Sequence, residues 1–191
     1  MRENFSGAQK NIYRLLINLD QEKVFPVLVG QNSSPLTEYT KDAGIEVVIL
    51  PYPNELEVYD GKLLSLNLKR VAKFMLGIIK YNKIFIKEFK ESKLEVVWCD
   101  NIRTFFTLYI PSKLIGAKVI WNIWSEPTGK VAWLLHRLGL ILSDTINVEY
   151  ADQGKKIFGK IADYSYFKKK IIPLYTGVSD FEEYQGTKIR E

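Results

Sequence analysis

The stretch SGAQKNIYRLLINLD, residues 6–20, places a tight turn of small residues directly before a helix. The apolar positions of that helix recur with helical spacing and are Ile12, Leu15, Leu16 and Leu19. In an open α/β sheet, such a turn normally follows a buried strand. Only residues 1–5 precede it here. We therefore expect this chain to lack the first strand of its fold, and to expose unpaired edges that favour association.

Short apolar runs rich in β-branched residues follow at regular intervals. Strands that are buried on both faces read as continuous apolar runs rather than alternating ones, so these runs indicate a mainly parallel sheet. The six predicted strands are Phe25–Gly30, Ile45–Pro51, Leu94–Asp100, Ala117–Ile123, Thr145–Tyr150 and Lys170–Tyr175.

Segments with helical spacing or length separate these strands. They are Leu36–Ala43, Leu63–Glu91, Thr104–Ile115, Lys130–Leu142 and Ala151–Phe158. Gly44 and Gly116 stand just past two of them, where a left-handed cap is expected. Strand alternating with helix predicts an α/β, doubly wound, mainly parallel sheet flanked by helices.

The composition predicts one domain in a reducing compartment. The chain has 191 residues, of which 47% are hydrophobic, and a single cysteine, Cys99. One cysteine excludes a disulfide framework, and no apolar run approaches the ~20 residues that span a bilayer. We expect a cytoplasmic protein. One cysteine and one histidine, His136, supply no metal-ligand cluster. We expect Cys99 to be an inert core residue, and His136 to lie on a helix surface or half-buried.

The net charge of +5 is concentrated on the long helix predicted at Leu63–Glu91. One interpretation is a packed helix with a solvated lysine face. Its core stripe would then be Leu68, Val71, Met75, Ile79 (or Ile78), Ile86 and Phe89. The alternative is a basic amphipathic helix that contacts an anionic membrane from the periphery. Nucleic acid is not an expected partner, because no recognised binding motif is present.

Polar residues collect where the predicted strands end, which is where open parallel sheets bind ligands. The candidate site residues at these ends are Asp100, Asn101, Arg103, Asn122, Trp124, Ser125, Glu126, Glu149 and Tyr150. The turn Ser6–Gln9 would join them if a strand preceded it. A helix N-terminus of this kind suits an anion such as phosphate. Ser6 and Gln9 also fit a capping box, which requires no ligand.

Several segments, taken in order, resemble the N-terminal half of a retaining glycosyltransferase of family 4, with the GT-B fold. They are SGAQKNIYRLL, VVWCDNIRTFF, KVIWNIWSEP, LLHRLGLILSDTINV and KKIIPLYTGVSDFEEY. The resemblance implies a Rossmann-like domain over residues 1–175. Residues 176–191 would be a hinge, or the start of a second domain that this chain lacks.

In such an enzyme, the resemblance implies that the N-terminal domain receives the acceptor and the C-terminal domain holds the nucleotide-sugar. Gly7 and Ala8 would present backbone amides near the diphosphate or acceptor, with Gln9 behind them. Asn101 and Arg103 would line the acceptor side, facing a lip of Trp124, Ser125 and Glu126. The acceptor would be a glycan or a lipid-linked sugar, and a second chain carrying the donor domain would be the partner.

The departures from the family pattern bear on catalysis. Trp124 or Asn122 stands where many members have a histidine, and Ser6 replaces a glycine of the turn. The family's E-x7-E carboxylates belong to the second domain. We therefore assign no catalytic residue and no cofactor, and expect this chain to be inactive alone. The non-enzyme hypothesis is an interaction module of the same fold, and a third is an unrelated doubly wound binding domain.

Overall fold

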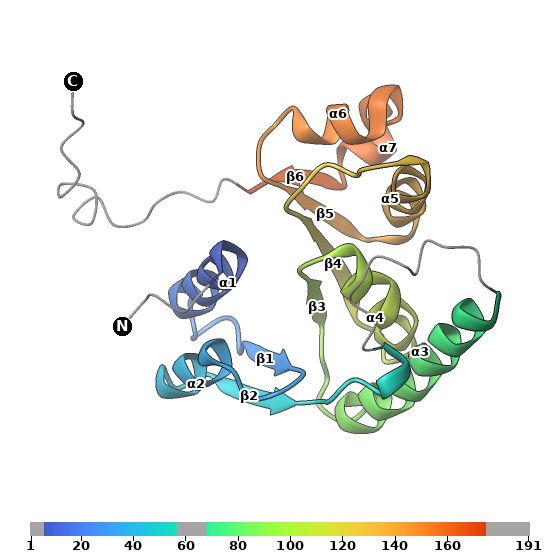
Figure 1. Ribbon diagram of the computed structural model, residues 1–191. Coiled ribbons are helices and arrows are strands. Elements are labelled where there is room, and N and C mark those ends of the chain that lie inside the picture. Colours follow the sequence, from blue (N-terminus) through green and yellow to red (C-terminus); the bar gives the residue numbers. More distant parts are fainter. Residues whose placement is uncertain (1–5, 57–67, 175–191) are drawn as a thin grey trace, which may run out of the picture.

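The computed structural model describes residues 6–56 and 68–174, and in these residues strands alternate with helices along the chain (Figure 1). The strands are β1 (Val27–Gly30), β2 (Glu46–Ile49), β3 (Val96–Cys99), β4 (Lys118–Ile123), β5 (Thr145–Val148) and β6 (Ile171–Pro173). The α-helices are α1 (Gly7–Asn18), α2 (Pro35–Asp42), α3 (Leu68–Phe89), α4 (Ile102–Leu114), α5 (Lys130–Leu142), α6 (Gln153–Phe158) and α7 (Ser165–Lys168). Two 3-10 helices are η1 (Asn54–Leu56) and η3 (Gly159–Asp163).

Each predicted strand is present, and each is shorter than predicted by one or two residues at one end or at both. The predicted hinge at residues 176–191 lies outside the described residues, as do positions 63–67 of the predicted long helix.

The six strands form two parallel sheets. β1 pairs with β2, and a larger sheet has the order β3-β4-β5-β6. In the larger sheet, Trp121 of β4 lies opposite Ile146 of β5. The prediction of parallel strands between helices is therefore confirmed. The division of these strands into two sheets is an additional finding.

The core of the larger sheet is built around one indole. The Trp121 side chain is 1% exposed and lies between α4 and α5. Its ring stacks on Phe105 at 5.1 Å between centroids and meets His136 at 5.0 Å. These contacts place α4 and α5 on the same face of the sheet. Cys99 is fully buried in this core, as predicted for a packing residue.

The core stripe predicted for the long helix is right at Phe89 and at the alternative position Ile78, and wrong at three other positions. Val71, Met75 and Ile79 are 40–50% exposed. The buried positions are Ile78, Tyr81, Phe85 and Phe89, with Phe74 half-buried. The two stripes differ by a rotation of the helix. The observed one buries large aromatic rings, which remove more apolar surface from water.

Glycine ends two helices where the sequence predicted it. Gly44 follows α2 with φ 81°, and Gly116 follows α4 with φ 86°. Residues with a Cβ rarely adopt this left-handed conformation, so glycine suits both caps.

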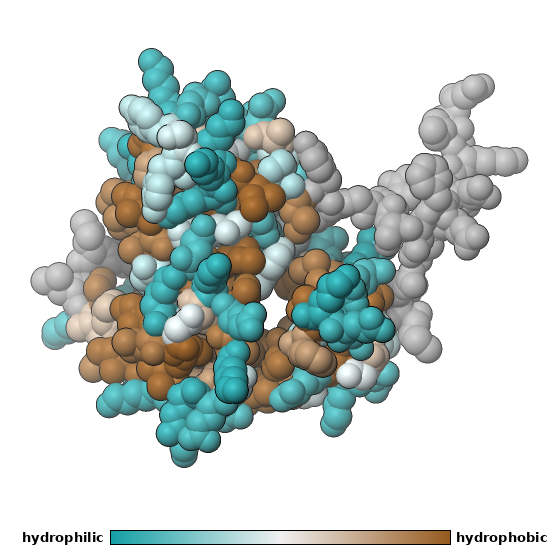
Figure 2. All heavy atoms as spheres, turned by 180° about the vertical axis from the view of Figure 1, so that it is seen from behind, coloured by the Kyte–Doolittle hydropathy of each residue, from teal (hydrophilic) through white to brown (hydrophobic). Residues whose placement is uncertain are grey.

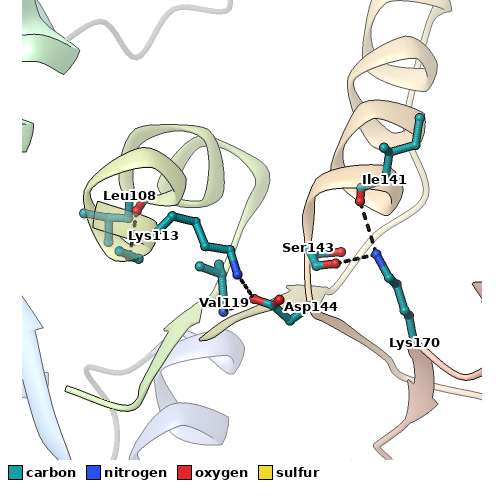
Figure 3. A network of polar contacts seen from close by, with 8 residues as sticks. Leu108, Lys113, Val119, Ile141, Ser143, Asp144 and Lys170 are labelled. Atoms are coloured by element: carbon teal, nitrogen blue, oxygen red, sulfur yellow. Dashed lines mark hydrogen bonds and ion pairs between the residues drawn. The ribbon is translucent and has the colours of Figure 1, made fainter. Parts of the chain in front are cut away.

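A polar network joins the starts of β4 and β5 to the ends of α4 and α5 (Figure 3). The Asp144 carboxylate accepts from Lys113 Nζ at 2.5 Å and from the Val119 backbone N–H at 2.6 Å. Lys170 Nζ donates to the carbonyl oxygens of Ile141 and Ser143. Burial raises the pKa of Asp144, but the bonds from Lys113 and Val119 outweigh it and hold this pKa below its usual value.

Asp144→Asn is expected to lower the free energy of unfolding at pH 7 by about 1 kcal/mol, a modest value because the side chain is partly exposed. The pKa of the Asp144 carboxyl is lower in the folded protein than in the unfolded chain. Such a group stabilises the folded protein when the pH lies above its pKa in the unfolded chain, and this stabilisation is lost as the pH falls through its pKa in the folded protein. The deficit of the variant should therefore shrink as the pH falls below about 4. Urea unfolding of the parent and of the variant at several pH values measures this difference in the free energy of unfolding.

The control for this prediction is Asp163→Asn. Asp163 forms a 3.5 Å pair with Lys155, and both side chains are more than half exposed. Asp163→Asn should change the free energy of unfolding by less than about 0.5 kcal/mol at any pH. Equal effects of the two substitutions would contradict the role of Asp144.

Candidate functional site

The residues that follow β3 form the first part of the candidate site. Asn101 caps α4, because its Oδ1 accepts from the Thr104 backbone N–H at 2.9 Å. Its amide nitrogen donates to Asp100 Oδ1 at 2.8 Å. Burial raises the pKa of Asp100, and a hydrogen bond from the Thr104 side chain partly offsets it. The capping bond fixes the direction of both side chains, and the Asp100 carboxylate stays close to the end of the strand.

Arg103 points from α4 toward the chain that follows β2. Its guanidinium donates to the Leu56 carbonyl oxygen and lies 5.9 Å from the centre of the Tyr52 ring. Arg103 thus ties α4 to η1. The predicted contact of Arg103 with an anion stays a prediction, since the structure contains no ligand.

Tyr52 lies where residues that follow three different strands meet. Its ring is 9% exposed and meets Tyr81 edge-on, at 4.7 Å between centroids. Burial raises its pKa, while hydrogen bonding with the Thr104 and Gln31 side chains and the charge of Arg103 lower it. Gln31 follows β1, Tyr52 follows β2 and Thr104 follows β3, so the carboxyl ends of both sheets meet here. The sequence analysis did not identify Tyr52 or Gln31.

The loops after β4 and β5 are joined by a chain of polar contacts. The Tyr150 hydroxyl donates to Glu126 Oε1 at 3.0 Å and accepts from Lys156 Nζ at 3.4 Å. The Lys156 ammonium also lies 5.0 Å from the centre of the Tyr150 ring. This bond to Tyr150 raises the pKa of Lys156. The structure therefore brings the predicted Glu126 and Tyr150 together, and it adds Lys156, which the sequence analysis missed.

Two buried donors near the end of β4 lack an acceptor among the described residues. They are Nδ2 of Asn122 and Nε1 of Trp124. Asn122 is 4% exposed and lies opposite Asn147 of β5, which is also buried. A buried donor without a partner costs free energy, so such groups are notable at a strand end where ligands bind.

Glu149 and Ser125 complete the list of predicted residues at the strand ends. The Glu149 backbone N–H donates to Oε1 of Gln153 at 2.7 Å, and Gln153 is 1% exposed. This bond fixes the loop after β5. Ser125 is exposed on the loop after β4.

The turn before α1 contains the predicted capping box. Gln9 N–H donates to Ser6 Oγ at 3.4 Å, and Ser6 N–H donates to Gln9 Oε1 at 3.0 Å. Gly7 is exposed, and a Cβ built on it would meet nothing within 4 Å. The helix that follows this turn packs on α2. The proposed contact of Gly7, Ala8 and Gln9 with a ligand stays a prediction.

His136 is buried in the core, deeper than the helix-surface or half-buried position that was expected. It is 7% exposed, its Nδ1 lies 2.8 Å from the Ala132 carbonyl oxygen, and burial lowers its pKa. Within residues 6–56 and 68–174, no group of three His, Cys, Asp or Glu side chains is placed to hold a metal ion. None of the helices in these ranges combines the length and hydropathy that crossing a bilayer requires.

Two solved glycosyltransferase structures of the GT-B fold are similar to this chain. HepE from Anabaena, crystallised in complex with UDP, has a TM-score of 0.58 and 9% identity, and the match covers 90% of this chain and 41% of HepE. MurG from Acinetobacter baumannii has a TM-score of 0.53 and 14% identity, over 77% of this chain and 39% of MurG. At these identities the likeness establishes the fold, which is the Rossmann-like α/β half of such enzymes.

This chain therefore spans about two fifths of the length of these two proteins. No protein-family model matches the sequence, and no curated protein sequence matches it either.

Proposed function

We propose that this chain is the acceptor-side domain of a glycosyltransferase that transfers a sugar from a nucleotide-sugar to a glycan or lipid-linked acceptor. The donor binds mainly to a second domain, carried by another part of the enzyme or by another chain, and this chain alone transfers no sugar. The likeness of its fold to HepE and MurG supports the proposal.

The observation that carries the proposal is the set of polar groups at the ends of β4 and β5. Sugar hydroxyls both donate and accept hydrogen bonds, and their ring faces pack on aromatic side chains. The free donors of Asn122 and Trp124 would bind hydroxyl oxygens, and the Glu126 carboxylate would accept from a hydroxyl. These groups position an acceptor, while the charge that develops on the departing diphosphate is stabilised by the donor domain.

The test is saturation-transfer NMR with a panel of oligosaccharides and a short-chain prenyl-linked sugar. At least one should bind, and Asn122→Leu should weaken that binding at least about tenfold, the ratio that 1.4 kcal/mol corresponds to. Because Asn122 Nδ2 is buried without an acceptor, the same variant should melt no lower than the parent. Glu91→Gln, at an exposed position just beyond α3, is the control.

Two results would contradict the proposal. One is that no sugar in the panel binds. The other is turnover of UDP- or GDP-sugars by this chain alone, because that would locate the donor site within it.

A second candidate function is an interaction module that docks on an anionic membrane through α3. The observation in its favour is that Val71, Met75, Leu76 and Ile79 are 40–56% exposed on this helix. Basic residues flank them at Lys69, Arg70, Lys73, Lys80, Lys83 and Lys87. If the protein sediments with phosphatidylglycerol vesicles and not with phosphatidylcholine vesicles, docking on an anionic membrane is favoured. If, in addition, no sugar binds, the interaction module is favoured over the enzyme domain.

A further inference from the structure

The outer surface of α5 is apolar, where a helix that faces water is usually polar. Four of its side chains are 42–59% exposed, and they are Val131, Leu134, Leu138 and Ile141. With 3.6 residues per turn, these positions lie opposite His136, which packs against the Trp121 indole on the inner side. A helix that is apolar on both its inner and its outer side is normally covered on both.

The exposed side chains follow the spacing of a coiled-coil seam. The intervals from Val131 to Leu134, Leu138 and Ile141 are three, four and three residues. This alternation is that of the a and d positions of a heptad, whose side chains insert between those of a facing helix. The stripe is about 15 Å long, since each residue of a helix adds 1.5 Å. It therefore matches an α-helix of about three turns.

α4 continues the apolar surface beside α5. Its Ile110 and Leu114 side chains are 55% and 71% exposed. The two helices pack against each other, and Lys113 of α4 bonds to Asp144, two residues after the end of α5, so their C-terminal ends are adjacent. In Figure 2, apolar residues gather on the left flank of the molecule, where α3, α4 and α5 lie.

The charged residues of α4 and α5 are all basic. α5 contains Lys130 and Arg137, and neither helix contains an acidic residue. If Val131 is an a position, Lys130 and Arg137 are both g positions, which flank the seam. Both side chains are exposed. Charges at the flanking positions decide which helices pair, so a helix that fits this face has acidic residues there.

We propose that the outer face of α5 binds an amphipathic α-helix of a partner protein, with apolar residues at its a and d positions and Glu or Asp beside them. A second copy of this chain is the weaker candidate, because its α5 would bring further basic residues and no acidic one. A membrane surface is also weaker, because helices that lie on membranes use Trp and Phe on their apolar face, and the stripe has neither. The inference does not depend on the proposed function.

The test uses a fluorescent synthetic peptide of about three heptads, with Leu at a and d and Glu at e and g. The Glu residues repel one another at pH 7, which keeps the peptide from pairing with itself. It should bind the full chain in an anisotropy titration. The same peptide with Lys at e and g should bind at least about tenfold more weakly, because like charges then meet. Arg137→Glu should reduce or reverse this preference.

Leu134→Ser should weaken binding of the Glu peptide at least about tenfold, since the leucine is buried only in the complex. Leu134 is 59% exposed, so this variant should melt close to the parent, and lost binding then reports the surface rather than the fold. Ile79→Ser is the matched control, because this α3 side chain is 49% exposed and lies outside the stripe. The control should bind the peptide as the parent does.

Four results would overturn the proposal. Neither peptide binds, or both bind equally well, in which case the basic residues select nothing. A dimer of the parent chain that Leu134→Ser dissociates would assign the stripe to a second copy. Sedimentation with phosphatidylglycerol vesicles that Leu134→Ser abolishes, without binding of the Glu peptide, would assign it to a membrane.

Discussion

Gly139→Ala is expected to lower the free energy of unfolding by about 3 kcal/mol, at the upper end of the usual cost of overpacking a core. Gly139 lies on the buried side of α5, and a Cβ there would stand 2.3 Å from Cζ3 of Trp121. The indole cannot move away easily, because Phe105 stacks on it and it is 1% exposed. Alanine favours helices by up to about 1 kcal/mol over glycine, which offsets only part of the clash.

Thermal or urea unfolding measures this effect, and the midpoint should fall by about 6–12 °C. Gly7→Ala is the matched control, because a Cβ at that exposed helix position meets nothing within 4 Å. Trp121→Phe should lessen the cost of the alanine, since the smaller ring leaves room for it, and a double-mutant cycle would report this coupling. An unchanged midpoint for Gly139→Ala would contradict the close packing of α5 on β4.

The fold was predictable because its signals are local. Continuous apolar runs such as those of β4 and β5 distinguish buried parallel strands from surface ones, and Gly44 and Gly116 mark helix ends through their conformation alone. The turn at Ser6 likewise predicted its own capping box. Such features depend on a few neighbouring residues, so the sequence contains them in full.

Which face of α3 is buried could not be predicted in the same way. Nearly every position of this helix is apolar or basic, so several stripes with helical spacing overlap in its sequence. The choice depends on what packs against it. Tyr52 lies edge-on to Tyr81, and a Cβ on Gly77 would stand 2.8 Å from Glu55 and 2.9 Å from Leu56. These partners come from 21 to 29 residues away in the chain, and no local pattern announces them.

The location of the candidate residues at the strand ends was predictable from the sequence, whereas their contacts were less so, and their role in binding stays a prediction. The rule that ligands bind at strand ends identified Asp100, Asn101, Glu126 and Glu149. The partners that orient them come from side chains without a motif: Tyr52 reaches across from β2, and Lys156 reaches Tyr150 from α6. Only the folded chain brings such residues together.

Tyr52→Ala is expected to lower the free energy of unfolding by about 3 kcal/mol, as is usual for the loss of a large buried aromatic side chain. The substitution removes the edge-on contact with Tyr81, the ring beneath the Arg103 guanidinium, and the hydroxyl that bonds to Gln31 and Thr104. These contacts join the sheet of β1 and β2 to the sheet of β3–β6 at their carboxyl ends. Without them, the smaller sheet should open before the larger one unfolds.

Tyr52→Phe distinguishes this role from a general loss of packing. It keeps the ring against Tyr81 and Arg103 and removes only the hydroxyl, so it should cost about 1 kcal/mol, the usual worth of a hydrogen bond. Hydrogen exchange measured by mass spectrometry should show peptides of β1, α2 and β2 losing protection first in Tyr52→Ala, while β4 and β5 keep theirs. A uniform loss of protection over both sheets would mean that Tyr52 supports the whole core rather than the junction between its two parts.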